Sequence, residues 1–103
     1  MIHVLATIEV VTGRRDEFLA EFRHIVPLVR AEHGCLEYGP AIDADTDLPA
    51  QKRDGDGIVT VIEKWESLAA LKAHLAAPHM VEYQPRVKHL VTSTTLRVLE
   101  PAL

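Results

Sequence analysis

Residues 58–83 read IVTVIEKWESLAALKAHLAAPHMVEY, and this stretch decides the fold. Its first part, 58–65, is rich in β-branched side chains and predicts a strand. Ser67 is a suitable N-cap for a short helix whose leucines face the core. Pro78 lacks an amide hydrogen and interrupts that helix, so a separate helical segment is expected after it.

The rest of the chain supplies partners for this strand and helix. Residues 2–11 alternate along a predicted strand, and 14–32 carry apolar residues at helical spacing. Further strands are expected over 35–42 and 91–100. The order β-α-β-β-α-β predicts an α+β, ferredoxin-like fold in a single domain, 1–103, with an antiparallel four-stranded sheet and both helices on one face.

The face of the sheet away from the helices is also expected to be apolar. We assign six residues of the first and third strands to it: His3, Leu5, Thr7, Val59, Val61 and Trp65. Such a surface is too hydrophobic to stay in water, so a homodimer with its sheets packed face to face, a dimeric α+β barrel, is predicted. The polar loop 43–57 either covers a site or is a flexible surface loop, and the sequence favours neither.

Composition narrows the class of protein. The net charge of −4, without a basic run, argues against nucleic acid and membrane partners. The single cysteine, Cys35, and the absence of a signal peptide or long apolar run predict a cytoplasmic protein. No phosphate loop or metal motif is present, and Pro78 separates His74 from His79, so neither a metal nor a cofactor is expected.

Glu63 is the most unusual residue of the stretch. It shares a strand face with Val61 and Trp65, and a carboxylate enclosed there needs a partner. Pairing with His74, His79 or Arg86 would satisfy it and tune a proton-transfer group. Taken alone, His74 is better explained as a half-buried histidine bonded to a backbone carbonyl, and Trp65 as a core aromatic.

Four further residues are considered, and the two tyrosines among them each have two interpretations. Tyr38 and Tyr83 would orient a phenolic ligand through their hydroxyls or simply pack with those hydroxyls at the rim. His3 is a candidate for substrate contact if it faces a cavity. Cys35 is interpreted as a small core residue.

Two strings carry a family resemblance. One is Glu63-Lys64-Trp65-Glu66-Ser67 with Leu71, His74 and Pro78-His79-Met80, and the other is Glu32-His33-Gly34-Cys35-Leu36-Glu37-Tyr38. They resemble the antibiotic biosynthesis monooxygenase superfamily, in particular its quinol monooxygenase branch. The resemblance covers nearly the whole chain. One departure is Val61, where some polyketide-oxidising members carry asparagine.

The resemblance implies a homodimeric, cofactor-independent enzyme that oxidises a quinol or polyphenol with molecular oxygen. It assigns proton transfer to His74 or His79, with Glu63 tuning the histidine and Trp65 packing on the ring. Tyr38, Tyr83 and Arg86 would contact the substrate oxygens. Two alternatives stay open: a dimeric module that binds a small aromatic without catalysis, and a sugar-phosphate-type isomerase of a sister branch. The isomerase would need a basic pocket, for which Arg86, Lys88 and Arg97 are the candidates.

Overall fold

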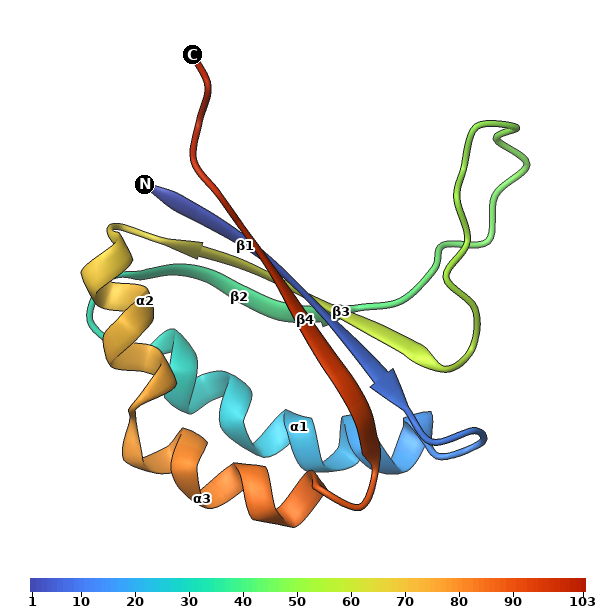
Figure 1. Ribbon diagram of the computed structural model, residues 1–103, viewed down its shortest axis with the longest axis horizontal. Helices are drawn as coiled ribbons and strands as arrows, with labels where there is room; N and C mark the ends of the chain where they lie inside the picture. The colour runs from blue at the N-terminus through green and yellow to red at the C-terminus, as the bar shows by residue number, and fades with distance from the viewer.

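A four-stranded antiparallel sheet carries three helices against one of its faces (Figure 1). The computed structural model describes residues 1–103. Along the chain the elements are β1 (Ile2–Val10), α1 (Arg15–Arg30), β2 (Cys35–Ala41), β3 (Ile58–Trp65), α2 (Leu68–Leu75), α3 (Pro78–Val87) and β4 (Val91–Leu99). The strand order β2-β3-β1-β4 confirms the predicted ferredoxin-like α+β fold. None of the helices combines the length and the apolar character needed to cross a bilayer.

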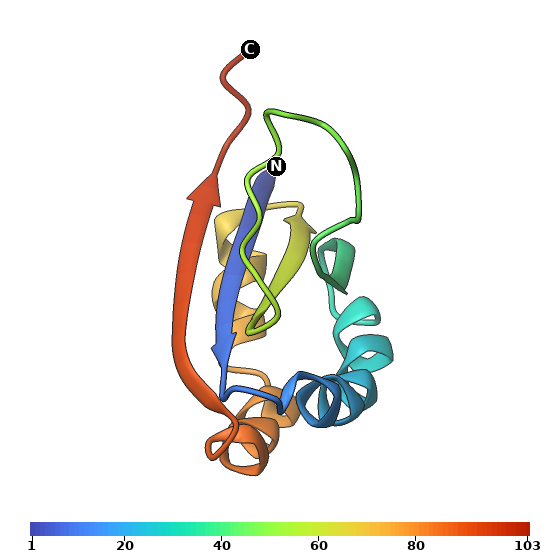
Figure 2. The ribbon, with the colours of Figure 1, turned by 90° about the vertical axis from the view of Figure 1, so that its right-hand side faces the viewer.

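The ends of the short helices follow from local chemistry. The Ser67 hydroxyl accepts the backbone N–H of Ala70 at 3.1 Å, which confirms Ser67 as the N-cap of α2. Pro78 begins α3, where its missing N–H is not needed and its fixed φ suits the first turn. The break at Pro78 turns α3 relative to α2: in Figure 2, α3 (orange) lies beside α1 (blue to cyan), whereas α2 (yellow-orange) lies behind the strands.

The face of the sheet under the helices holds the core. Alternate residues of β1 are buried there, and the register pairs Ala6 with Val61 and Ile8 with Val59. Residues opposite each other in an antiparallel pair share a face. Val59, Val61 and Trp65 therefore belong to the helix-covered core, and their predicted place on the outer face was wrong. Alternation defines two faces but does not say which of them is covered.

The outer face is consequently more polar than expected. His3 and Leu5 pair with Lys64 and Ile62 on one side and with Leu99 and Arg97 on the other. Its apolar members lie among threonine, lysine and arginine side chains. Ile62 is 44% exposed and Leu99 is 40% exposed, so a hydrophobic strip remains open on this face.

The helix α2 packs through a different stripe from the predicted one. Leu71 is buried as expected, but Leu68 and Leu75 are each 47% exposed. Ala70 and His74 are buried in their place. The buried stripe of α2 is thus Ala70, Leu71 and His74, and the Ala70 side chain lies close to Gly34 in the turn between α1 and β2.

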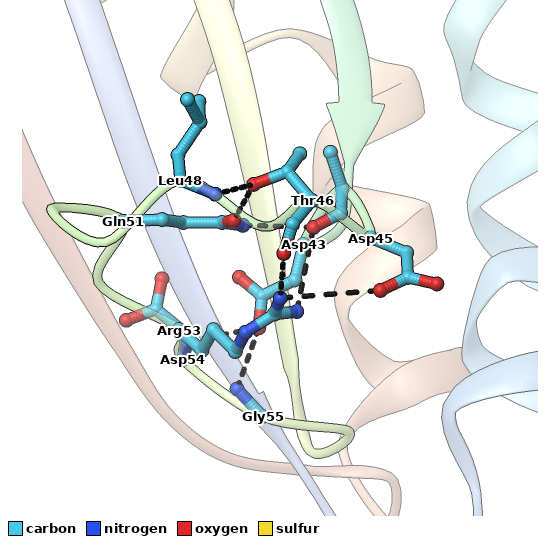
Figure 3. Close-up of polar contacts among 9 residues, drawn as sticks. Asp43, Asp45, Thr46, Leu48, Gln51, Arg53, Asp54 and Gly55 are labelled. Atoms are coloured by element: carbon cyan, nitrogen blue, oxygen red, sulfur yellow. Dashed lines mark hydrogen bonds and ion pairs between the residues drawn. The ribbon is translucent and has the colours of Figure 1, made fainter.

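The 43–57 loop extends from the end of the sheet opposite to α2 (Figure 1). Its own residues hold it together (Figure 3): the Asp43 carboxylate accepts the N–H groups of Asp54 and Gly55, both at 2.9 Å. These hydrogen bonds hold the pKa of Asp43 below its ordinary value. The side chain of Arg53 donates to the Thr46 carbonyl at 2.6 Å. The loop is thus internally bonded, and none of its residues lines the cavity described below.

Candidate active site

A half-open cavity of about 760 Å³ lies between the inner face of the sheet and the three helices. The sheet contributes apolar side chains such as Ala6 and Val61, α1 contributes Phe18 and Phe22, and α3 contributes Met80. Seven lining residues carry polar side-chain groups: Tyr38, Glu63, His74, Tyr83, Gln84, Lys88 and Thr94. A mostly apolar hollow with a few polar groups is the usual character of a small-molecule site.

His74 forms one wall of this cavity although only 2% of it is exposed. Its ring packs against two aromatic rings: Trp65, with centroids 4.7 Å apart, and Tyr38, at 5.4 Å in an edge arrangement. Its Nδ1 contacts Glu32, and Nε2 has no partner in the protein. Since no buried side-chain nitrogen or oxygen lacks a partner, Nε2 reaches accessible space, which is the cavity.

Glu63 lies on the neighbouring part of the wall and is 6% exposed. The Trp65 indole N–H donates to its Oε1 at 2.9 Å. Glu63 forms no hydrogen bond with His74, His79 or Arg86, so the predicted hydrogen-bonded pair was wrong; the indole N–H satisfies the carboxylate instead. Burial raises the pKa of the Glu63 carboxyl, and the indole hydrogen bond and His74 offset part of that rise.

The partner of both histidines is Glu32, just beyond the end of α1. Its Oε2 lies 2.8 Å from His74 Nδ1 and 2.8 Å from His79 Nε2. His79 is partly exposed and does not line the cavity. We did not predict Glu32 as a site residue. It is 42 residues from His74 and 47 from His79, so no local spacing reveals the contact.

Both tyrosines pack against Phe22: Tyr38 is stacked on its ring with centroids 5.7 Å apart, and Tyr83 meets it in an edge arrangement at 6.1 Å. Both line the cavity. Burial raises the pKa of each phenol well above its ordinary value, with nearby carboxylates adding to the effect. Both hydroxyls therefore keep their hydrogen near neutral pH and serve as hydrogen-bond donors.

Besides His79, three more of the predicted site residues lie away from the cavity. His3 is on the outer face of the sheet, and Arg86 is exposed on α3 outside the cavity lining. Trp65 is fully buried behind His74 and supports the wall rather than forming it. The structure thus brings Tyr38, Glu63, His74 and Tyr83 together around one hollow. No three His, Cys, Asp or Glu side chains are grouped so that they could hold a metal ion.

The buried carboxylate gives a pH-dependent prediction for Glu63→Gln. The folded pKa of Glu63 lies above its ordinary 4.5, so the native state binds the proton more tightly than the unfolded chain. The free energy of unfolding of the wild type should therefore fall as the pH rises from about 4.5 through the folded pKa. The total fall is about 1.4 kcal/mol for each unit by which the pKa of Glu63 in the folded state exceeds its pKa in the unfolded state. Glutamine does not titrate, and its carbonyl can accept the Trp65 N–H.

Urea unfolding of both proteins between pH 4 and pH 8 measures this effect. We expect Glu63→Gln to match the wild type at pH 4 and to be more stable at pH 7. A difference in free energy of unfolding between the two proteins that stays constant with pH contradicts the burial argument. So does a variant that is less stable than the wild type at pH 7.

Comparison with known proteins places this chain in a family. The family described as antibiotic biosynthesis monooxygenase matches residues 1–86. The chain belongs to the antibiotic biosynthesis monooxygenase family. Membership confirms the family expected from the sequence and supports an oxidoreductase activity.

Individual proteins resemble this chain in sequence and in structure. The chain is 40% identical to the "Probable quinol monooxygenase YgiN" of Escherichia coli, over the full length of both. It is 31% identical to the "Putative monooxygenase YcnE" of Bacillus subtilis, over 90% of this chain and 88% of that one. The crystal structure of PA3566 from Pseudomonas aeruginosa superposes with a TM-score of 0.81 at 25% identity, covering 99% of this chain and 94% of the other. Rv0793 from Mycobacterium tuberculosis gives 0.78 at 28% identity, covering 97% and 93%.

Proposed function

We propose that this protein is a cofactor-independent monooxygenase that oxidises a quinol or a related polyphenol with molecular oxygen. The observation that carries the proposal is the cavity wall itself. An apolar hollow presents one imidazole nitrogen, one carboxylate and two protonated phenols to whatever it encloses. This combination suits a flat aromatic ring with hydroxyl substituents. The relative named as a probable quinol monooxygenase adds support.

Oxidation of a quinol by oxygen requires a group that accepts the hydroxyl proton of the substrate, whereas the electrons can come from the substrate itself. A deprotonated hydroquinone is electron-rich and can reduce oxygen itself. In the overall reaction one oxygen atom is bonded to a ring carbon in place of hydrogen, the quinol becomes a hydroxyquinone, and the second oxygen atom leaves as water with two hydrogens. The four electrons come from the substrate.

The residues have separate roles in this scheme. His74 accepts the hydroxyl proton at Nε2, the only one of its nitrogens that faces the cavity. Glu63 stabilises the imidazolium that forms, since its carboxylate interacts favourably with a charged His74. Tyr38 and Tyr83 donate hydrogen bonds to the substrate oxygens. The aromatic and aliphatic walls exclude water from the reacting ring.

Oxygen uptake with chemically reduced 1,4-naphthoquinone tests the proposal. The protein should accelerate uptake above the spontaneous autoxidation rate, with saturation in quinol. Heat-denatured protein controls for trace metal. Uptake equal to autoxidation at every protein concentration contradicts an enzyme; tight quinol binding without uptake would instead support the alternative of a non-catalytic binding module.

The isomerase alternative has little support in the cavity. Lys88 is the one lysine or arginine that lines the cavity, whereas Arg86 is outside it and Arg97 pairs with Leu5 on the outer face. Stabilisation of the fold by inorganic phosphate at millimolar concentration would favour that alternative, and we expect none.

A homodimer remains part of the proposal. Leu5, Ile62 and Leu99 form an apolar strip on the outer face, where Ile62 is 44% and Leu99 40% exposed. Packing a second copy over these residues removes them from water. Sedimentation velocity at micromolar concentration should give twice the mass of the 11.5 kDa chain. A sedimenting mass of one chain at that concentration contradicts the dimer.

A further inference from the structure

A single carboxylate oxygen of Glu32 lies within hydrogen-bond distance of the imidazole rings of His74 and His79. We call these three residues the His74–Glu32–His79 cluster. The Oε2 atom of Glu32 lies 2.8 Å from His74 Nδ1 and 2.8 Å from His79 Nε2. The Glu32 side chain is 13% exposed, His74 is 2% exposed, and His79 is 23% exposed. The cluster therefore runs from the cavity wall towards the protein surface.

This geometry determines where the ring hydrogens are. An ionised carboxylate has no hydrogen and can only accept a hydrogen bond. The two nitrogens that face it, His74 Nδ1 and His79 Nε2, must therefore each carry a hydrogen. A neutral imidazole has one ring hydrogen. A neutral His74 then has its hydrogen on Nδ1 and its lone pair on Nε2, the nitrogen that reaches the cavity.

We propose that Glu32 is the positioning residue of this site, which holds His74 in the Nδ1–H tautomer so that Nε2 can accept a proton from the substrate. This inference rests on the proposed function, in which His74 is the base. His79 is the second donor to the same oxygen and holds the carboxylate in place from the solvent side. After proton transfer, Glu32 becomes the counter-charge of the imidazolium at hydrogen-bond distance.

The other groups around His74 do not replace Glu32 in this role. Glu63 interacts with His74 electrostatically, but its hydrogen bond is with the Trp65 indole. Tyr38 presents a ring edge and Trp65 a ring face. Only Glu32 forms a hydrogen bond with the His74 ring.

Nitrogen-15 NMR of the wild-type ring nitrogens, without substrate, gives the first test. At a pH where His74 is neutral, we expect a protonated Nδ1 and an unprotonated Nε2. A protonated Nε2 with a bare Nδ1 overturns the proposal, whatever the protein does with quinols. Conversely, the expected tautomer in a protein that consumes no oxygen would contradict the proposed function and leave the role of Glu32 in fixing the tautomer intact.

Glu32→Gln gives the second test. The single carbonyl oxygen of glutamine replaces a charged acceptor, and its NH2 group competes for the imidazole lone pairs. We expect a shift of His74 towards the Nε2–H tautomer and a fall in kcat of roughly 10²-fold. KM should stay unchanged, because Glu32 does not line the cavity.

Glu82→Gln is the matched control, since it removes an exposed carboxylate from α3 and should leave tautomer and kcat as in the wild type. A folded Glu32→Gln protein with the wild-type tautomer and wild-type kcat overturns the proposal. If Glu32→Gln does not fold, the wild-type NMR experiment still decides it.

Discussion

Replacing His74 with glutamine is expected to lower kcat for oxygen-dependent quinol oxidation by roughly 10²- to 10⁴-fold, the usual contribution of general acid–base catalysis. Glutamine preserves much of the side-chain volume that packs against Trp65 and Tyr38 and can still donate a hydrogen bond to Glu32. It has no nitrogen lone pair to offer the cavity. The loss should therefore be in proton transfer and not in the fold.

Steady-state oxygen uptake measures the loss, and circular dichroism with thermal unfolding checks that the variant is folded. His24→Gln is the control, because His24 is exposed on α1. A folded His74→Gln protein that turns over at the wild-type rate would remove His74 from the mechanism.

The largest effect on stability is expected for Gly34→Ala. Gly34 has a φ of +80°, and a Cβ built on it lies 2.7 Å from the Cβ of Ala70. The left-handed conformation costs roughly 1–2 kcal/mol for a residue with a Cβ. The overlap with Ala70 adds about 1–3 kcal/mol, because the turn and α2 must move apart.

Gly13→Ala separates these two effects. Gly13 has a φ of +79° but nothing within 4 Å of the position of its Cβ. Urea unfolding should therefore show a smaller loss for Gly13→Ala than for Gly34→Ala. Equal losses would mean that the close approach at Gly34 contributes nothing.

The contact at Gly34 also explains how the site is assembled. Gly34 follows Glu32 by two residues and its carbonyl accepts the Glu66 N–H at 2.8 Å, which fixes the turn against the start of α2. Ala70 precedes His74 by one helical turn. The lack of a side chain at Gly34 thus lets Glu32 reach His74.

The sequence predicted the elements better than their relation to one another. The strand 58–65, the Ser67 cap and the break at Pro78 depend on residues close together in the chain, and all three are confirmed. The face on which Val59, Val61 and Trp65 lie depends on the pairing of β3 with β1. Periodicity does not contain that information.

The same limit applies to the site. The sequence indicated Glu63 and His74 as unusual polar residues in an apolar stretch, and both line the cavity. It offered His74, His79 or Arg86 as the partner that a buried Glu63 carboxylate would need. Their actual hydrogen-bond partners are Trp65, two residues from Glu63, and Glu32, which only the folded chain brings to His74.

The most direct test of the central claim is oxygen uptake under ¹⁸O₂ with reduced 1,4-naphthoquinone, followed by mass spectrometry of the product. If the cavity oxygenates a quinol with His74 as base, the wild-type protein should yield a hydroxyquinone carrying one ¹⁸O atom, and His74→Gln should yield little of it. Formation of unlabelled quinone and hydrogen peroxide alone, at the same rate with both proteins, would contradict the claim.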